Sequence, residues 1–301
     1  MLLGAAMIWG FAFTAQDAIE GLGAASVGAV RSLIAGVFLI FVIILFDRLG
    51  TKRRLVSKAG IDISRGELIG GIVAGIVLAL ASLLQQTGIA LGTDGGKAAF
   101  ITSLYVVLVP IYNLFLKRRA PINVWIGVAL AAVGFYLICV KDDLTIVASD
   151  AVVAACALVF PIHIIVIDRF SPSVNGVRMS MVQFFTAGII QGVIALIFEA
   201  PIDPSAIGAN IVPLLFLGVG SSGIAYTLQI LGQGGVEPAP AAIIMSLESV
   251  FGVIGTAIVF GTVLEVREYI GCAVILVAVI LSQLTFGNKA EKEDVLPSPD
   301  N

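Results

Sequence analysis

The sequence Met245-Ser246-Leu247-Glu248-Ser249-Val250-Phe251 sets one carboxylate inside an apolar run that extends from Ala239 to Val259. If this run crosses a lipid bilayer as a helix, Glu248 lies about eleven residues past Glu237, at a depth of ~16 Å, close to the midplane. An ionised carboxylate there costs roughly 2.5–3.5 kcal/mol even on lenient insertion scales, so it usually faces a cavity or a partner, or carries a proton. The stretch therefore indicates a polar site in the middle of a membrane protein.

The composition of the whole chain agrees with a membrane setting. The 301 residues are 59% hydrophobic and 12% charged, with a mean hydropathy of +1.08, whereas soluble domains carry about 25% charged residues. A net charge of −3 and an isoelectric point near 5.2 argue against a nucleic-acid partner. The lipid bilayer is the expected surrounding of this chain.

The residues needed for enzymatic or metal chemistry are scarce. Cys139, Cys156 and Cys272 lie in separate apolar runs without C-x-x-C spacing, and His163 is the single histidine, so neither a disulfide framework nor a zinc site is indicated. The chain has no nucleophile-elbow, H-E-x-x-H, Walker or Rossmann signature. We therefore expect no enzyme, no catalytic residue, no metal site and no cofactor.

Apolar runs of spanning length recur along the chain and predict ten transmembrane helices. They lie near 2–16, 24–46, 68–90, 98–116, 122–140, 149–167, 176–198, 211–229, 239–259 and 269–286. The short alternating segments of a membrane β-barrel are absent. The first run has no basic leader and no clear cleavage site, so we expect a retained helix rather than a signal peptide. The predicted fold class is an all-α integral membrane protein.

The positive charges are distributed unevenly between alternate loops, which predicts the orientation. With the amino terminus inside, the cytoplasmic loops hold Arg48, Lys52, Arg53, Arg54, Lys58, Arg65, Lys117, Arg118, Arg119 and Arg169, with Lys289 and Lys292 in the tail. The outer loops hold only Lys97, Lys141 and Arg267. Both termini are expected in the cytoplasm of a cell with a bacterial-type inner (plasma) membrane, and the polar tail 287–301 is expected to be disordered.

The chain also matches itself, which predicts an internal repeat. A shift of 143 residues places Gln86 on Gln229, Ala98-Ala99 on Ala241-Ala242 and Ser103-Leu104 on Ser246-Leu247, a shift of 147 places Arg31 on Arg178, and Gly127 falls on Gly271 after one inserted residue. The repeats are 1–141 and 142–286, each with five helices. An odd helix number inverts the second copy, an arrangement typical of secondary transporters.

The repeat sorts the polar residues of the spans by depth, which gives the candidate substrate-binding residues. The first half places Gln16, Arg31, Gln85, Gln86 and Lys97 toward the outer face, and the second half places His163, Arg178, Tyr226 and Gln229 toward the inner face. Tyr105, Trp9 and Glu248 lie between these layers. We expect two polar vestibules around one central site, each available to one side at a time, as alternating access requires.

Each of these residues also has a purely structural interpretation. Glu248 could bind a substrate amine, couple transport to a proton, or hydrogen bond to a neighbouring helix. Arg31 could extend outward to pair with Asp17 or Glu20. Lys97 could attract an anionic group or remain solvated beside Asp94.

The remaining candidates are the histidine, the aromatic residues and two prolines. His163 is expected to pack or to line a pore rather than to relay protons. Tyr105, Tyr226 and Trp9 could stack on a cargo ring or pack against neighbouring helices. Pro110 and Pro161 are expected to kink their helices and free backbone carbonyls.

Several of these features resemble the EamA-type members of the drug/metabolite transporter superfamily over nearly all of residues 1–286. They are Trp9-Gly10, Arg31, the segment from Gly96 to Pro110, and Ser246-Leu-Glu-Ser-Val-Phe251 followed by Glu265 and Gly271. The chain departs from the family pattern at Ser249, where proline is frequent, at Lys117-Arg118-Arg119, where an acidic residue is frequent, and in the first helix, which lacks the usual polar lead. The resemblance implies a ten-helix exporter or importer of small metabolites with a central site.

The leading hypothesis is a secondary-active carrier, taken to be an exporter, for a small-molecule substrate in the plasma membrane. A coupling proton or an exchanged metabolite would supply the driving force, since the sequence has no ATP-binding signature. A non-transporting membrane scaffold or sensor subunit, and a flippase for a lipid-linked substrate, are the alternatives.

Overall fold

The structure is a computed structural model that describes residues 1–48, 63–93, 95–139, 147–201, 204–260 and 265–284. Within these ranges the regular elements are all helical. The first half contains α1 (Leu2–Gly10), α2 (Ala12–Asp17), α3 (Ala24–Arg48), α4 (Arg65–Ala90), α5 (Gly95–Ser103), α6 (Tyr105–Phe115) and α7 (Ile122–Cys139). The second half contains α8 (Ala148–Phe170), η1 (Ser171–Ser173), α9 (Gly176–Phe198), α10 (Pro204–Ala209), α11 (Ile211–Leu215), η2 (Phe216–Tyr226), α12 (Thr227–Gln233), α13 (Pro238–Met245), α14 (Glu248–Phe260) and α15 (Val266–Gln283).

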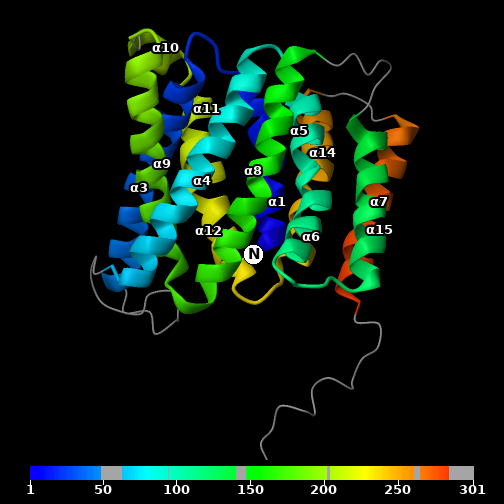
Figure 1. Cartoon of the computed structure of the whole chain (residues 1–301). Coiled ribbons are helices and arrows are strands. Elements are labelled where there is room, and N and C mark those ends of the chain that lie inside the picture. The colour runs from blue at the N-terminus through cyan, green and yellow to red at the C-terminus, as the bar shows by residue number, and fades with distance from the viewer. Residues whose placement is uncertain (49–62, 94, 140–146, 202–203, 261–264, 285–301) are drawn as a thin grey trace, which may run out of the picture.

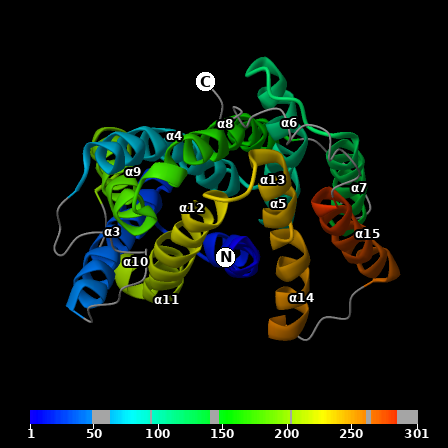
Figure 2. The same ribbon diagram turned by 90° about the horizontal axis from the view of Figure 1, so that it is seen from below.

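The long helices form one bundle in which they run in roughly the same direction or its reverse (Figure 1). Viewed from below, α3, α9, α4, α8, α6, α7 and α15 form an arc, and α1 lies inside it between α12 and α14 (Figure 2). The arrangement leaves α1 and the breaks in its neighbours at the centre of the protein.

Eight helical segments within the described residues are long and apolar enough to cross a membrane. They are 24–46, 65–90, 97–115, 148–173, 176–198, 211–233, 238–255 and 266–283, and a shorter apolar helix covers Ile122–Ile138. The first predicted span is divided into α1 and α2 at Phe11. The protein is therefore a multi-pass helical membrane protein, and the predicted tail 287–301 lies outside the described residues.

Two of the spans are broken at corresponding positions of the two halves. The helix that contains Lys97 breaks at Leu104, and the helix that contains Glu248 breaks at Ser246 and Leu247. At both breaks the backbone tightens, since the amide of Leu104 donates to Ile101 and that of Leu247 donates to Ile244, three residues back. Such mid-helix tightening is typical of hinges and functional sites.

The last helix of each half packs against the other along glycines. A Cβ on Gly134 would lie 2.9 Å from the carbonyl oxygen of Gly271, and a Cβ on Gly127 would lie 3.1 Å from that of Ala278. A step of seven residues up α7 thus matches a step of seven residues down α15. The two helices are antiparallel, and glycine is needed because their backbones touch.

Polar contacts join the loops at each end of the bundle. At one end Arg118 pairs with Asp168 at 2.5 Å, and the carboxylate of Glu67 accepts a bond from the amide of Asn175. At the other end Lys97 pairs with Asp150. The contacts at each end thus join the first half of the chain to the second, and most of the basic loop between α3 and α4 is outside the described residues.

The apolar core is divided into two main clusters, one around α6, α7, α13 and α15 and the other around α3 and α9. Trp9 and Phe160 pack against both clusters. The space between the clusters is where the polar residues of the spans gather.

Candidate functional site

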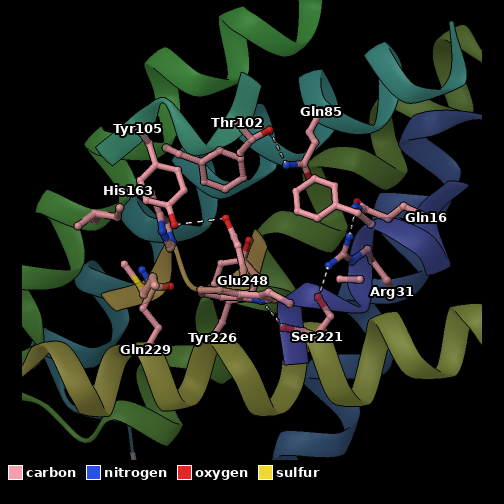
Figure 3. Close-up of a pocket in the computed structure, with 16 residues that line it drawn as sticks. Gln16, Arg31, Gln85, Thr102, Tyr105, His163, Ser221, Tyr226, Gln229 and Glu248 are labelled. Carbon is pink, nitrogen blue, oxygen red and sulfur yellow. Dashed lines mark hydrogen bonds between the residues drawn. The ribbon is translucent and has the colours of Figure 1, made fainter. Parts of the chain in front are cut away.

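A cavity lies at the centre of the bundle and holds about 530 Å³ of space between atoms, part of it open to solvent. The cavity is lined by Trp9, Ala12, Phe13, Gln16, Arg31, Gln85, Thr102, Tyr105, Phe160, His163, Ile164, Ser221, Tyr226, Gln229, Met245 and Glu248 (Figure 3).

Glu248 supplies the carboxylate of the cavity from the first residue of α14, directly after the break. Its side chain is buried, and Oε1 accepts a 3.3 Å hydrogen bond from the hydroxyl of Tyr105 (Figure 3). Ser103 and Ser249 join their hydroxyls at 3.2 Å beside this pair. The two broken helices thus meet at the carboxylate, which has acceptor positions left for a ligand.

Arg31 supplies the guanidinium of the cavity from α3. Nη1 donates to Oε1 of Gln16 at 3.2 Å, Nη2 donates to the hydroxyl of Ser221 at 3.0 Å, and Nε donates to the hydroxyl of Ser222 at 3.1 Å. These partners are neutral, so the positive charge of the guanidinium is not cancelled by them. They differ from the pairing with Asp17 or Glu20 that the sequence suggested.

Aromatic rings form the wall near the carboxylate. The ring of Tyr226 packs edge-on against Trp9 at 4.7 Å, against Phe184 at 5.6 Å and against His163 at 5.7 Å between centroids. The indole nitrogen of Trp9 donates to the carbonyl of Ser221 at 3.1 Å. The rings are therefore packed against one another and give the cavity an apolar, aromatic surface.

Amide side chains complete the polar lining. Gln85 donates to the hydroxyl of Thr102 at 3.2 Å, which joins α4 to α5 (Figure 3). His163 Nε2 lies 3.1 Å from Oε1 of Gln183, and Gln229 donates to Gln233 at 2.9 Å. The imidazole thus has a packed environment with an amide partner.

Most of the candidate residues chosen from the sequence line this one cavity. They are Trp9, Gln16, Arg31, Gln85, Tyr105, His163, Tyr226, Gln229 and Glu248. Gln86 and Lys97 do not line it, and neither does Arg178. Gln86 is buried elsewhere on α4, and Lys97 contacts Asp150 at the end of the bundle. The outer and inner layers expected as separate vestibules therefore contribute to a common space.

Several other residues that line the cavity were not predicted from the sequence. These are Ala12, Phe13, Thr102, Phe160, Ile164, Ser221 and Met245. Most are apolar or small and look like any other residue of a membrane helix. The consecutive pair Ser221-Ser222 in an apolar run was the one available signal.

Helices of membrane-spanning length enclose a cavity with buried charged side chains, an arrangement that secondary transporters use. The chain belongs to the EamA-like transporter family, which matches it twice, over residues 1–140 and 148–284. It is 29% identical over 289 residues to an uncharacterized transporter of Archaeoglobus fulgidus, a match that covers 93% of this chain and 83% of the relative. A protein of known crystal structure shares the fold, with a TM-score of 0.70 at 17% identity over 94% of this chain and 96% of the other.

Proposed function

We propose that this protein is a secondary-active exporter of a small amphipathic metabolite that carries a protonated amine. The observation that supports this most is the distribution of groups around one cavity. A carboxylate lies at one side, a guanidinium with neutral partners lies at the other, and aromatic rings lie beside them. Buried charges are costly in a membrane, and a ligand with complementary groups would offset that cost.

The chemistry of the cargo follows from these three parts. The amine would contact Glu248, an acceptor group such as a carboxylate or carbonyl would contact Arg31, and the apolar body would lie against Trp9 and Tyr226. Arginine is suited to planar acceptors because its donors form a fixed fork. A zwitterion with a hydrophobic side chain satisfies all three contacts.

Alternating access between two inverted repeats is the proposed mechanism. Tyr105 and Glu248 are 143 residues apart, which is the offset that aligns the two halves in sequence. The two residues are therefore equivalent positions of the proposed repeats, and equivalent residues contact each other only near the two-fold axis that relates the repeats. The repeat also relates two contacts between α7 and α15, that of Gly134 with Gly271 and that of Gly127 with Ala278. An offset of 144 residues, which aligns Gly127 with Gly271, also aligns Gly134 with Ala278 and so converts one contact into the other. Both relations favour repeats 1–141 and 142–286 that enclose a shared site.

The proposed setting is an inner or plasma membrane with both termini in the cytoplasm, which the excess of basic residues in alternate loops favours. Export would be driven by a proton or by an exchanged metabolite. The protein would need no cofactor for this cycle, and it is proposed to be a non-enzyme.

Flux in liposomes tests the proposal. The purified protein is reconstituted, and transport of labelled hydrophobic amino acids, their decarboxylated amines, sugars, nucleosides and a lipid-linked sugar is measured. We expect saturable uptake of an amine-bearing cargo. The Glu248→Gln variant is expected to lower this uptake at least tenfold. An absence of flux across this panel, together with a stable protein partner in pull-downs, would reject the carrier in favour of a scaffold. Flux of a lipid-linked compound alone would indicate a flippase.

A further inference from the structure

A row of buried glutamines continues from the cavity between α8, α9 and α12. Gln229 lines the cavity, and Gln183 and Gln233 lie behind it, all at most 2% exposed. Gln229 donates to Gln233 at 2.9 Å, and Gln233 donates to the carbonyl of Ile164 at 3.1 Å. Gln183 contacts His163, which itself lines the cavity. Polar side chains therefore extend beyond the lining of the cavity.

Two atoms of this row, and the hydroxyl of Ser171 near its end, have unused hydrogen-bonding capacity. Nε2 of Gln183, Oε1 of Gln229 and the hydroxyl of Ser171 are buried and have no hydrogen-bond partner within the described part of the chain. An unpaired buried polar group costs about 1–3 kcal/mol, and the cost is larger where lipid excludes water. Groups of this kind are retained where water or a polar ligand can reach them.

The row leads to one end of the bundle. A Cβ on Gly234, the residue after Gln233, would lie 4.0 Å from the hydroxyl of Ser171. Ser171 follows the last residue of α8, close in sequence to Asp168 of the ion pair with Arg118. The glutamines therefore extend from the cavity toward the end of the bundle that carries the Arg118 loop.

The ring of Tyr226 lies where the row meets the cavity. It precedes Gln229 by three residues, one helical turn, and it packs against His163 and Phe184, the residue next to Gln183. Figure 3 shows Tyr226 beside Gln229 and below Glu248. Tyr226 is therefore placed to close the passage from the cavity to the row.

Tyr226 is also the last residue of the π-helix η2. A π segment contains extra backbone relative to an α-helix and is often found at functional sites. If the π segment shifts along the chain by one residue, the side chains of the residues that it passes rotate about the helix axis by about 100°. This provides a way to swing the ring without unfolding the span.

We infer that Gln183 and Gln233, which lie behind Gln229, form a second compartment of the transport route, which takes the hydrogen-bonding groups of the cargo and its water, and which the Tyr226 ring closes off from the cavity. The inference rests on the proposed transport function. It adds a specific exit from the cavity and a specific gate.

Cysteine accessibility tests the compartment without any need for transport. In a variant in which Cys139, Cys156 and Cys272 are replaced by alanine, Gln233→Cys is reacted with a small, charged, membrane-impermeant methanethiosulfonate in liposomes. Tyr226→Ala is expected to raise the reaction rate at least tenfold, whereas Tyr226→Phe, which keeps the ring, leaves it unchanged. Tyr226→Leu is expected to raise the rate as Tyr226→Ala does, and it is used instead if the alanine variant unfolds.

Ile230→Cys is the matched control, because Ile230 is equally buried on the same helix and packs in an apolar cluster with Ala74, Ile167 and Met179. Its rate should stay low in every Tyr226 background. Equal rates at Gln233→Cys in all backgrounds, or an equal rise at Ile230→Cys, would overturn the compartment. Flux measured in parallel separates the two proposals, since Tyr226-dependent labelling without flux rejects only transport, and flux with Tyr226-independent labelling rejects only the compartment.

Discussion

Gly10 and Gly252 bring two helices into backbone contact beside the cavity. A Cβ on Gly10 would lie 2.6 Å from the amide nitrogen of Gly252, and a Cβ on Gly252 would lie 3.0 Å from the carbonyl oxygen of Gly10. Trp9 precedes the first glycine, and Glu248 lies one turn before the second. The closeness of α1 to α14 therefore fixes how far the indole is from the carboxylate.

Gly10→Ala should disrupt this contact. The added methyl group meets backbone atoms that cannot turn away, so we expect a loss of about 1–3 kcal/mol of stability and a severalfold fall in flux. Gly4→Ala is the control, because its nearest neighbour is the flexible end of Leu228 at 3.4 Å. Thermal unfolding in detergent and flux in liposomes measure the two effects, and equal behaviour of the two variants would contradict the steric argument.

Arg31→Lys should change which cargo is carried. Lysine keeps the charge but loses the fork that holds Gln16, Ser221 and Ser222. We expect at least a tenfold loss of apparent affinity for a zwitterionic amino acid and less than a threefold loss for the amine that lacks its carboxylate. Competition uptake with the two compounds gives the ratio. A similar loss for both would mean that Arg31 only holds the helices together.

The two ion pairs of α8 should differ in their contribution to stability. Asp150 is 5% exposed at its side chain and also accepts from the hydroxyl of Thr93 at 3.0 Å and the amide of Val147 at 2.9 Å. Arg118 is 53% exposed. Asp150→Asn is expected to lower the unfolding temperature clearly, whereas Arg118→Gln should cost at most about 1 kcal/mol, an effect that salt removes. Unfolding curves at low and high salt test both, and the reverse order would refute the prediction.

Glu199 should stabilise the start of α3. Its carboxylate accepts from the amides of Ala25 at 2.7 Å and Ser26 at 2.9 Å, and from the Ser26 hydroxyl at 2.6 Å. These amides are donors that a helix leaves unsatisfied at its first turn. We expect Glu199→Ala to cost about 1–2 kcal/mol and Glu199→Gln to cost less, because the amide oxygen still accepts. The order of the two unfolding temperatures is the measurement.

Much of the fold was predictable because a membrane restricts it. Apolar runs had to be helices, and their limits agree with the described helices within a few residues in most spans. The placement of Tyr105 and Glu248 between the two polar layers could be predicted as well, and the structure adds their hydrogen bond. Polar residues such as Arg31 and Gln85 were visible because they are costly in lipid.

What remained unpredictable depends on rotation and on local backbone geometry. Gln85 and Gln86 are equally polar, but consecutive residues of a helix point about 100° apart, and only Gln85 lines the cavity. Lys97 pairs with Asp150 rather than facing a ligand, which depends on how distant helix ends meet. The π-helix Phe216–Tyr226 has no residue pattern that distinguishes it from an ordinary span.

The attachment of α8 at both of its ends has a mechanical consequence. Asp150 joins it to Lys97 at the start of α5, and Asp168 joins it to Arg118 just beyond α6. Attachment at both ends opposes tilting of α8 against α5 and α6, so these three helices should move together. The relative motion that opens either face of the protein should then occur between this unit and the other helices of the bundle.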